Sequence, residues 1–442
     1  MDFKTDINYR RQTLIKLLDA IQSREGEIIK ALQEDFGKSA FETVLTETYQ
    51  VVAELKRAIK NIHRWAKPKR VFPSLLNFPT SDYLYAEPYG SVLVIAPWNY
   101  PFQLAMAPLV AAVAAGNSVT LKPSELTPKT SELVAEIVRL VFDPNHVEVY
   151  QGGAEVTQKL LSRRWDYIFF TGSVAVGKII AKAAAENLTP VTLELGGKNP
   201  CIVDSSANIA LAAKRIVWGK FLNAGQTCIA PDYILVQNKV KPKLLDHLKQ
   251  EITKAYGENP QMSADFARII NAKNWSRLAD KIDSDKVYFG GQINAETNYI
   301  APTIIDEPAL ESAIMQDEIF GPLLPVISYE NEQEIETIIS KYEKPLSLYV
   351  FSDDKPFAKR MVRDFSFGGG CINDTVVYFG NARLPFGGVG HSGMGAYHGK
   401  RSFDTFSHFK PIVKKANWLD IPLRYAPYGD KLKTLRRILK WL

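Results

Sequence analysis

The alternation of apolar and polar positions divides the chain into a helical beginning and two regions in which strands and helices alternate. Leucine and isoleucine recur at helical spacing over residues 8–66, where glycine and proline are nearly absent, so this stretch is predicted to be helical. Residues 67–80 contain three prolines and show no clear period, which predicts a connecting loop.

Short runs rich in β-branched residues then alternate with amphipathic stretches. The predicted strands are residues 91–96, 118–122, 147–151 and 167–170, and the predicted helices between them are residues 104–115, 130–142 and 154–161. A second series begins near residue 191, with a helix at 209–222 and strands at 202–203, 233–236, 326–328, 346–351 and 370–373. This rhythm predicts an α/β fold in which helices cover parallel sheets, with two lobes that meet near residue 194.

Length and composition agree with a globular protein of two or three domains. The chain has 442 residues, of which 46% are hydrophobic and 23% are charged. No apolar run approaches the ~18 residues of a membrane span, and the first residues lack a basic head before an apolar core, so we expect no secretory signal. The three cysteines, Cys201, Cys228 and Cys371, are too few for a disulfide framework and favour a reducing, cytoplasmic compartment.

The net charge of +6 is concentrated at the C-terminal end. Residues 410–442 contain nine Lys or Arg and two Asp, so the rest of the chain is close to neutral and we expect no nucleic-acid partner. Within this tail, Leu432, Leu435, Leu439 and Leu442 fall on one helical face among basic residues. Such a helix can lie on a membrane surface as a peripheral contact, but we favour a helix that is docked on the protein or solvated.

Residues 171–178 are the first of four segments with candidate chemistry. They follow a predicted strand and open a predicted helix, and Gly172 and Gly177 would let the backbone approach a phosphate at the helix N-terminus. Their spacing is neither that of the dinucleotide fingerprint nor that of a P-loop. A plain tight turn therefore remains an equally good interpretation.

Glu194 is a lone acid inside the apolar run 191–195. A carboxylate that is desolvated there would have a raised pKa and could act as a general base near neutral pH. The alternative is a strand-end glutamate that pairs with Lys198.

Cys228 ends the glycine-bearing loop 223–228, which follows a predicted helix. Such a loop can expose a thiol for nucleophilic attack, although free cysteines are more often buried for packing. Both interpretations stay open on spacing alone.

Residues 317–322 combine an acid, an aromatic ring and a turn. Glu318 could hold a ribose diol while Phe320 packs on the sugar or on a nicotinamide ring. A helix C-terminus followed by Gly-Pro is the alternative.

Two other chemistries are excluded by the sequence. Residues 390–394 resemble a nucleophile elbow, but Met394 stands where the second glycine is required, so we reject a serine hydrolase. The six histidines show no metal-ligand spacing, and we expect no metal site. Cys201 and Cys371 are predicted to be packing residues.

Six short motifs, taken together, resemble the aldehyde dehydrogenase superfamily. In chain order they are Pro-Trp-Asn-Tyr-Pro at 97–101, Lys-Pro-Ser-Glu at 122–125, Phe-Thr-Gly-Ser at 170–173, Glu-Leu-Gly-Gly-Lys at 194–198, Gly-Gln-Thr-Cys at 225–228 and Glu-Ile-Phe-Gly-Pro at 318–322. The resemblance covers nearly the whole chain. The short N-terminus and the segments 384–390 and 393–400 are most similar to the class 3-type branch, which acts on fatty and aromatic aldehydes.

This resemblance implies a role for each candidate residue. Cys228 would be the nucleophile, Glu194 the base and Asn99 the oxyanion-hole amide. The cofactor would be NAD, with NADP as the alternative. Its adenosine ribose would contact Lys122 and Glu125, and its nicotinamide ribose would contact Glu318 and Phe320. Its pyrophosphate would contact Thr171, Gly172, Ser173 and the turn to Gly177. Glu125 favours NAD, because its charge would repel a 2′-phosphate. Trp98, Tyr100 and Phe386 are candidates for the wall of the aldehyde tunnel, with ordinary packing as the alternative.

The implied reaction is oxidation of an aldehyde to the acid through a thiohemiacetal and a thioester on Cys228, with water activated by Glu194. Transfer of the acyl group to coenzyme A or phosphate is a second hypothesis, which a water-activating base disfavours. A dinucleotide-binding structural protein is a third, which the set of Asn99, Glu194 and Cys228 disfavours.

The resemblance also implies a domain organisation and an assembly. Residues 1–193 would form the NAD(P)-binding domain, with a bridging segment near 80–90, and residues 194–399 the catalytic thiol domain. Residues 400–442 would form an oligomerisation segment and a basic tail. The expected fold is therefore two Rossmann-like lobes, one cofactor-binding and one catalytic, plus a small bridging element, in a homodimer.

Overall fold

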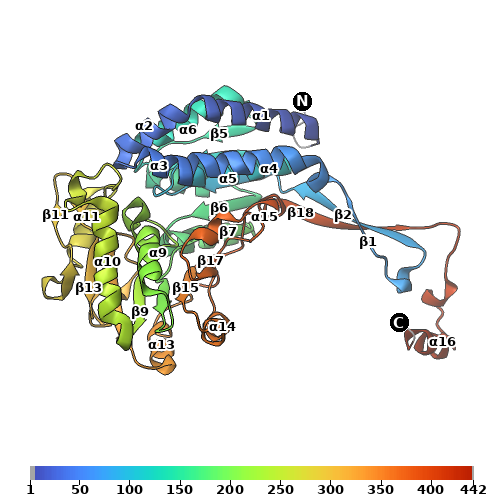
Figure 1. Cartoon of the computed structure of the whole chain (residues 1–442). Helices are drawn as coiled ribbons and strands as arrows, with labels where there is room; N and C mark the ends of the chain where they lie inside the picture. Colours follow the sequence, from blue (N-terminus) through green and yellow to red (C-terminus); the bar gives the residue numbers. More distant parts are fainter. Residues whose placement is uncertain (1–4, 441–442) are drawn as a thin grey trace.

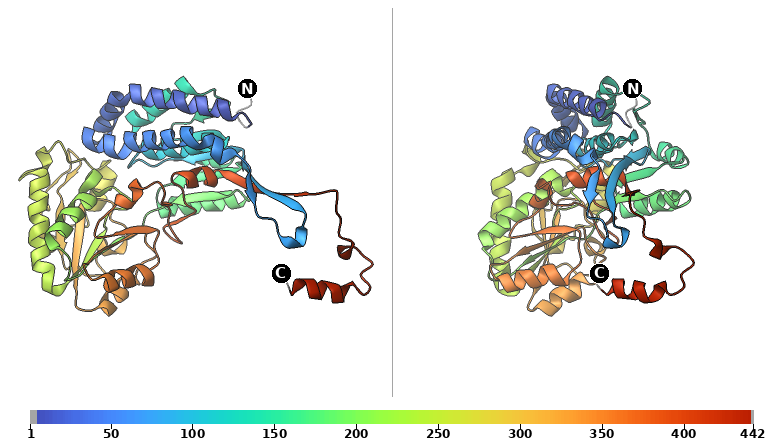
Figure 2. Two further views of the ribbon diagram at one scale, coloured as in Figure 1. Left: turned by 45° about the vertical axis from the view of Figure 1, so that its right-hand side comes forward. Right: turned by 90° about the vertical axis from the view of Figure 1, so that its right-hand side faces the viewer.

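A computed structural model describes residues 5–440 and shows a two-lobed body from which a narrow arm and a terminal helix project (Figures 1 and 2). The predicted α/β fold with parallel sheets and a small additional element is confirmed.

Helices cover one end of the body. They are α1 (Ile7–Ser23), α2 (Glu25–Phe36), α3 (Ala40–Thr43), the π-helical turn η1 (Val44–Thr48) and α4 (Tyr49–Ala66). The prediction of helix over 8–66 is correct except for a break after α2, where Gly37 adopts a left-handed conformation with φ of 69° and ends the helix. After the break, η1 packs beside α2, α4 and α5 (Gln103–Ala115).

A six-stranded sheet forms the first lobe, in the order β17-β7-β6-β3-β4-β5. Its strands are β3 (Ser91–Ile95), β4 (Ser118–Lys122), β5 (Val147–Val149), β6 (Tyr167–Thr171), β7 (Val191–Glu194) and β17 (Gly393–Met394). All pairings are parallel except that of β17 with β7. The strand order reverses between β3 and β6, and ligands of open α/β sheets bind beyond the carboxyl ends of strands at such a point.

A seven-stranded sheet forms the second lobe, in the order β10-β13-β14-β9-β8-β15-β16. Its strands are β8 (Pro200–Val203), β9 (Tyr233–Gln237), β10 (Val287–Phe289), β13 (Thr303–Asp306), β14 (Leu323–Tyr329), β15 (Ser347–Phe351) and β16 (Gly369–Ile372). The strands predicted from β-branched runs are all present. Cys201 is fully buried in β8, as expected of a packing residue, whereas Cys371 in β16 is half-buried.

The remaining helices flank these sheets and connect their strands. They are α5 (Gln103–Ala115), α6 (Pro128–Val141), α7 (Ala154–Leu161), α8 (Val174–Ala185), α9 (Ile209–Phe221), α10 (Lys241–Tyr256), α11 (Ala272–Ala279), α12 (Ala313–Gln316), α13 (Glu332–Ile339), α14 (Lys355–Asp364) and α15 (Lys400–Thr405). Every side chain of α5 is buried, because this helix lies between α4 and the first sheet.

The arm is a three-stranded antiparallel sheet of β1 (Lys69–Val71), β2 (Thr80–Pro88) and β18 (Ser407–Lys415). The prediction of a loop over 67–80 is therefore wrong at both ends. The sequence of β1, Lys-Arg-Val, has no alternation of apolar and polar residues that would predict a strand. Its backbone pairing with β2 defines it as one. A separate hairpin joins β11 (Ile293–Asn294) to β12 (Tyr299–Ile300).

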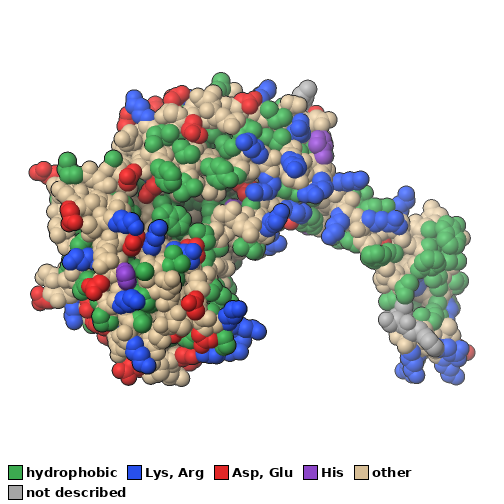
Figure 3. Space-filling view, in the orientation of Figure 1, with side chains coloured by type: hydrophobic (Ala, Val, Ile, Leu, Met, Phe, Trp, Pro, Cys, Tyr) green, Lys and Arg blue, Asp and Glu red, His purple; other side chains and the backbone are tan. Residues whose placement is uncertain are grey.

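The tail beyond the arm ends in α16 (Lys431–Leu439), which lies away from the body in Figure 1 and in the left view of Figure 2. No side chain of this helix is buried, so it is not docked on its own chain, and the solvated helix stays a prediction. Apolar side chains gather on the tail, with lysine and arginine at its end (Figure 3). Leu442 lies outside the described residues. Among residues 5–440, no helix is long and apolar enough to cross a membrane.

Candidate active site

The reversal of strand order in the first sheet brings together two turns that were predicted from separate motifs. β3 ends at Ile95 and leads into residues 97–102, which carry Asn99, while β6 ends at Thr171 and leads into Gly172 and Ser173. Ser173 accepts a hydrogen bond from the backbone N–H of Val176 and so caps α8. The turn therefore presents a helix N-terminus to the same region as Asn99.

Cys228 follows a turn with an unusual backbone. Asn223, Ala224 and Gly225 have φ values of 55°, 52° and 75°, and a Cβ on Gly225 would lie 2.3 Å from the carbonyl oxygen of Gly321. Successive left-handed residues cost free energy and persist where surrounding contacts hold them. Asn199 supplies one such contact, since its side-chain amide donates to the carbonyl of Cys228 at 2.8 Å.

Hydrogen bonds join the Cys228 turn to the Asn99 turn. The side-chain amide of Asn99 donates to the carbonyl of Gln226 at 3.1 Å, and that of Asn223 donates to the carbonyl of Asn99 at 2.9 Å. The hydroxyls of Tyr100 and Thr227 lie 2.5 Å apart. These hydrogen bonds hold the Asn99 turn against the Cys228 turn, next to the thiol in the chain.

Glu194 ends β7 and is 2% exposed. Neither carboxylate oxygen has a hydrogen-bond partner among the described residues, and burial raises the pKa of this carboxyl well above its ordinary value. The alternative pairing with Lys198 is wrong, because Lys198 instead lies 2.6 Å from Asp232. A buried carboxyl without a structural partner is the state expected of a base.

Burial also raises the pKa of the Cys228 thiol, and the nearby Glu318 and Glu194 carboxylates raise it further. The thiol is therefore uncharged at neutral pH in the protein alone. Its conversion to the thiolate requires a group that takes the proton or a positive charge that stabilises the anion.

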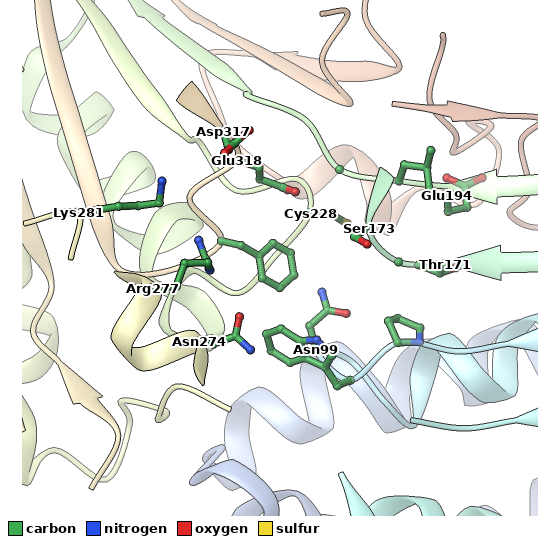
Figure 4. A pocket seen from close by; sticks show the side chains of 16 residues that line it. Asn99, Thr171, Ser173, Glu194, Cys228, Asn274, Arg277, Lys281, Asp317 and Glu318 are labelled. Atoms are coloured by element: carbon green, nitrogen blue, oxygen red, sulfur yellow. The ribbon is translucent and has the colours of Figure 1, made fainter. Parts of the chain in front are cut away.

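Cys228 lies on the wall shared by two cavities, together with Thr171, Glu194 and Leu195. Polar and charged side chains make up most of the residues that line the first cavity, which measures about 390 Å³ and is called the polar cavity below. In Figure 4, Thr171, Ser173 and Glu194 approach it from one side, Asp317, Glu318, Lys281 and Arg277 from the other, and Cys228 lies between them.

The second cavity is apolar and measures about 370 Å³. Its lining includes Leu45, Tyr49, Tyr100, Leu104, Trp218, Ile229, Val377, Phe379, Phe386 and Tyr397. Tyr100 and Phe386 thus line the pocket as predicted for a tunnel wall. Trp98 does not, since it lines the polar cavity and packs edge-on against Phe320, with ring centroids 5.2 Å apart.

The predicted cofactor residues divide into two groups. Thr171, Gly172, Ser173, Glu318 and Phe320 all line the polar cavity. Lys122, Glu125 and Gly177 do not. Lys122 pairs with Glu125 at the end of β4, and Gly177 lies in the first turn of α8, where a Cβ would meet the Leu195 side chain at 2.7 Å. Close helix packing is a sufficient reason for that glycine.

Three groups of the polar cavity were missed by sequence reasoning. Asn274 and Arg277 lie on α11 and Lys281 follows it, and they form part of the cavity wall. Their segment contains no recognisable motif. The only available signal was the helical spacing of the two cations, which is ordinary for a solvated helix face.

A nicotinamide dinucleotide fits the polar cavity by its chemistry. Buried oxygens of Thr171 and Glu318 have no partner among the described residues and would accept or share hydrogen bonds with ribose hydroxyls. Burial raises the pKa of Glu318 to about 8, with the Asp232 carboxylate adding to this effect. Arg277, Lys281 and the N-terminus of α8 offer positive charge to a pyrophosphate.

Comparison with known proteins decides the family. The sequence profile described as "Aldehyde dehydrogenase family" matches residues 3–412. The chain belongs to the aldehyde dehydrogenase family. It is 48% identical over 437 residues to the 4,4'-diaponeurosporen-aldehyde dehydrogenase of Staphylococcus aureus (strain NCTC 8325 / PS 47), a match that covers 98% of this chain and 95% of that protein.

Two further matches agree with this assignment. The chain is 43% identical over 410 residues to aldehyde dehydrogenase family 3 member A2 of Pongo abelii, covering 93% of this chain and 84% of that protein. A solved structure described as the substrate-bound state of Staphylococcus aureus AldH matches with a TM-score of 0.96 at 48% identity, covering 98% and 95% of the two chains.

These matches confirm the class 3-type branch. This aldehyde dehydrogenase is an NAD(P)-dependent enzyme that oxidises an aldehyde to the acid. Its use of NAD or NADP agrees with solved relatives of the same fold that contain NAD+ or NADP.

Proposed function

We propose that Cys228 is the nucleophile of this aldehyde dehydrogenase and that Glu194 and Asn99 assist it. The observation that carries the proposal is the position of the thiol and the Glu194 carboxyl on the wall between a polar and an apolar cavity. An enzyme that joins a charged cofactor to an apolar aldehyde needs its reacting groups at such a boundary.

The first step is attack of the Cys228 sulfur on the aldehyde carbon, with Glu194 accepting the thiol proton. The oxyanion that forms receives hydrogen bonds from the Asn99 side-chain amide and from the backbone N–H of Cys228. Asn99 uses one of its two N–H donors on the carbonyl of Gln226, so the other is available for the oxyanion.

When a nicotinamide dinucleotide is bound, it supplies the hydride acceptor. Loss of hydride from the thiohemiacetal carbon leaves a thioester on Cys228. After it has released the thiol proton to solvent, Glu194 takes a proton from water, which attacks the thioester carbon. The acid then leaves, and Glu194 returns this proton to the departing sulfur, which restores the thiol. The absence of any hydrogen-bond partner for Glu194 among the described residues supports its availability for water.

For the cofactor, Thr171, Gly172, Ser173, Glu318 and Phe320 would hold the pyrophosphate and the nicotinamide ribose, since they line the polar cavity. Lys122 and Glu125 remain proposed contacts of the adenosine ribose, and Gly177 part of the phosphate turn. NAD is proposed over NADP because of the Glu125 charge.

For the substrate, the apolar cavity favours an aldehyde with an aliphatic or aromatic body. Its wall contains the side chains of Leu104, Ile229, Phe379 and Phe386, and about 25 cal/mol is gained for each Å² of apolar surface removed from water.

The three parts of the chain are proposed to have separate roles. Residues 1–193 would bind the cofactor, residues 194–399 would carry the thiol, and residues 400–442 would serve assembly.

Assembly is proposed to be a homodimer through the arm. The outer edge of β18 is unpaired within residues 5–440, and Phe409, Ile412 and Val413 on this strand are exposed. Exposed apolar edges of this kind are normally covered by another chain. Light scattering at micromolar concentration tests this state.

A cytoplasmic location is proposed from the three free cysteines, and a peripheral membrane contact of the tail is not favoured.

The deciding experiment compares Cys228→Ala with Cys371→Ala. Aldehyde-dependent formation of NADH should fall about 10⁴-fold or more in Cys228→Ala, because the nucleophile is lost. It should be unchanged in Cys371→Ala, a half-buried thiol outside both cavities. Retention of activity in Cys228→Ala would refute the assignment, and an acyl-thioester product on addition of coenzyme A would favour acyl transfer instead.

A further inference from the structure

A buried ion pair lies behind the active site and takes no part in the reaction described above. The Nζ atom of Lys38 lies 2.7 Å from Oε1 of Glu47, and both side chains are fully buried. Burying two charges costs free energy that the pair itself seldom recovers, so further contacts are expected to explain it.

Glu47 makes those contacts with the turn that carries Asn99. Its second oxygen, Oε2, accepts hydrogen bonds from the backbone N–H groups of Phe102 and Gln103, at 3.1 and 2.8 Å. These groups lie at the start of α5, which has no side-chain cap of its own. A carboxylate is stabilised at a helix N-terminus, so Glu47 from η1 caps a helix that is distant in sequence.

Lys38 contacts the same turn at Tyr100. Its ammonium lies 4.0 Å from the centroid of the Tyr100 ring, a cation–π distance. The Tyr100 hydroxyl in turn bonds Thr227, the residue before Cys228. The ion pair therefore contacts the turn at Tyr100 and Phe102 and, through Tyr100, reaches the Cys228 turn.

Glu42 holds the Cys228 turn from the same segment. Its Oε2 accepts a hydrogen bond from the backbone N–H of Asn223 at 3.0 Å, at the first of the three left-handed residues. Burial raises the pKa of Glu42 to about 7, and the nearby Lys38 opposes this rise. Residues 38–47 therefore contact both the turn that carries Asn99 and the turn that precedes Cys228.

We propose that Glu47, held by Lys38, is a positioning residue for the reaction: it fixes the Asn99 amide relative to the Cys228 sulfur. The inference rests on the proposed roles of these two residues. Displacement of a catalytic group by about 1 Å can cost 10²-fold in rate. Glu47 itself lines neither cavity, although Leu45 and Tyr49 of the same segment line the apolar one. Its loss should therefore lower kcat by a larger factor than it raises the KM for the aldehyde.

Two variants test the position of the carboxylate. Glu47→Gln keeps the shape and removes the charge, and Glu47→Asp keeps the charge paired with Lys38 but withdraws it by one methylene. Both should lower kcat about 10- to 100-fold, with KM within about threefold. If Glu47→Gln yields no folded protein, Glu47→Asp carries the same test.

Glu307→Gln is a control with the same bonding pattern at a more exposed site. The Glu307 carboxylate also accepts bonds from a lysine, Lys241 at 2.6 Å, and from a backbone N–H, that of Ser328 at 2.9 Å, but it lies outside both cavities. It should lower the melting temperature without lowering kcat. An equal loss of kcat in the Glu307 and Glu47 variants at an equal loss of melting temperature would overturn the proposal.

A double-mutant cycle with Asn99→Ala tests the route of the effect. Asn99→Ala should lose about 10²- to 10³-fold in kcat, and adding Glu47→Gln should cost less than about threefold more, because the positioned group is gone. Full multiplication of the two losses would overturn the positioning role. If Asn99→Ala keeps its kcat, the oxyanion role proposed above is wrong, and with it the route through Asn99. If only Glu47→Gln keeps its kcat, the positioning role alone fails.

Discussion

The two cavities that meet at Cys228 are nearly equal in volume, about 390 and 370 Å³, but opposite in character. One has acids, cations and a helix N-terminus around it, and the other has aliphatic and aromatic walls. They share the thiol and the Glu194 carboxyl. This contrast indicates that recognition of the cofactor and of the aldehyde is separated in space, while the chemistry is confined to the common wall.

Glu194→Gln should have the largest effect of the substitutions that sharpen this contrast. Turnover should fall about 10²- to 10⁴-fold, since the base is lost from the common wall. If Glu194 is needed chiefly for hydrolysis, a rapid burst of about one NADH per active site should remain before the slow phase. Stopped-flow absorbance measures both phases, and a fast steady state would contradict the role of Glu194 in activating water.

The same variant should be more stable than the parent. The pKa of Glu194 is raised in the folded protein, so this carboxyl destabilises the fold as pH rises above its ordinary pKa. A neutral amide removes that cost at neutral pH and should raise the melting temperature by about 1 to 3 °C.

The pH dependence should follow the raised pKa values of the common wall. Burial raises the pKa of both Glu194 and Cys228, so the groups are protonated at low pH and become active as pH rises. We expect kcat/KM to rise about tenfold per pH unit from about pH 6 until the first raised pKa is passed. A rate that is constant across this range, at saturating cofactor, would argue against titration of these groups.

Val377→Asp should act on the apolar cavity alone. Val377 lines that cavity and is partly exposed, so the new carboxylate can remain hydrated without unfolding the core. The KM of an aliphatic aldehyde should rise about tenfold, a loss of roughly 1.4 kcal/mol in apolar binding. The KM of the cofactor should not change, and a parallel rise of both values would contradict the separation of the two cavities.

Lys281→Met should give the smallest effect, on the polar cavity. Lys281 is partly exposed and also donates to the carbonyl of Ala313 at 2.6 Å, so its charge is screened by water. A KM increase of about two- to fivefold for NAD, with an unchanged KM for the aldehyde, is expected from an exposed cation. Increased salt should shrink the difference between the variant and the parent.

The sequence predicted the lobes well because their strands are buried on both faces and read as continuous apolar runs. The hydrophobic pattern did not predict β1 or the strand pairing of the arm, where pairing rather than side-chain pattern decides the structure, although the family resemblance indicated a bridging segment near residues 80–90. The turns that follow β3 and β6 were predicted from separate motifs, and the structure places them next to each other where the strand order reverses. Arg277, Lys281 and the pair of Lys38 with Glu47 were missed, because a charged residue in or beside a helix gives no signal that its side chain faces inward.

The short strand β17 has a consequence for the order of synthesis. Gly393 and Met394 pair with Glu194 and Leu193, about 200 residues earlier in the chain. The edge of the strand that carries the base is therefore covered by a segment that leaves the ribosome about 200 residues after it. The first lobe can begin to fold while the chain is still being made, but the wall that holds Glu194 is completed only after this later segment has emerged.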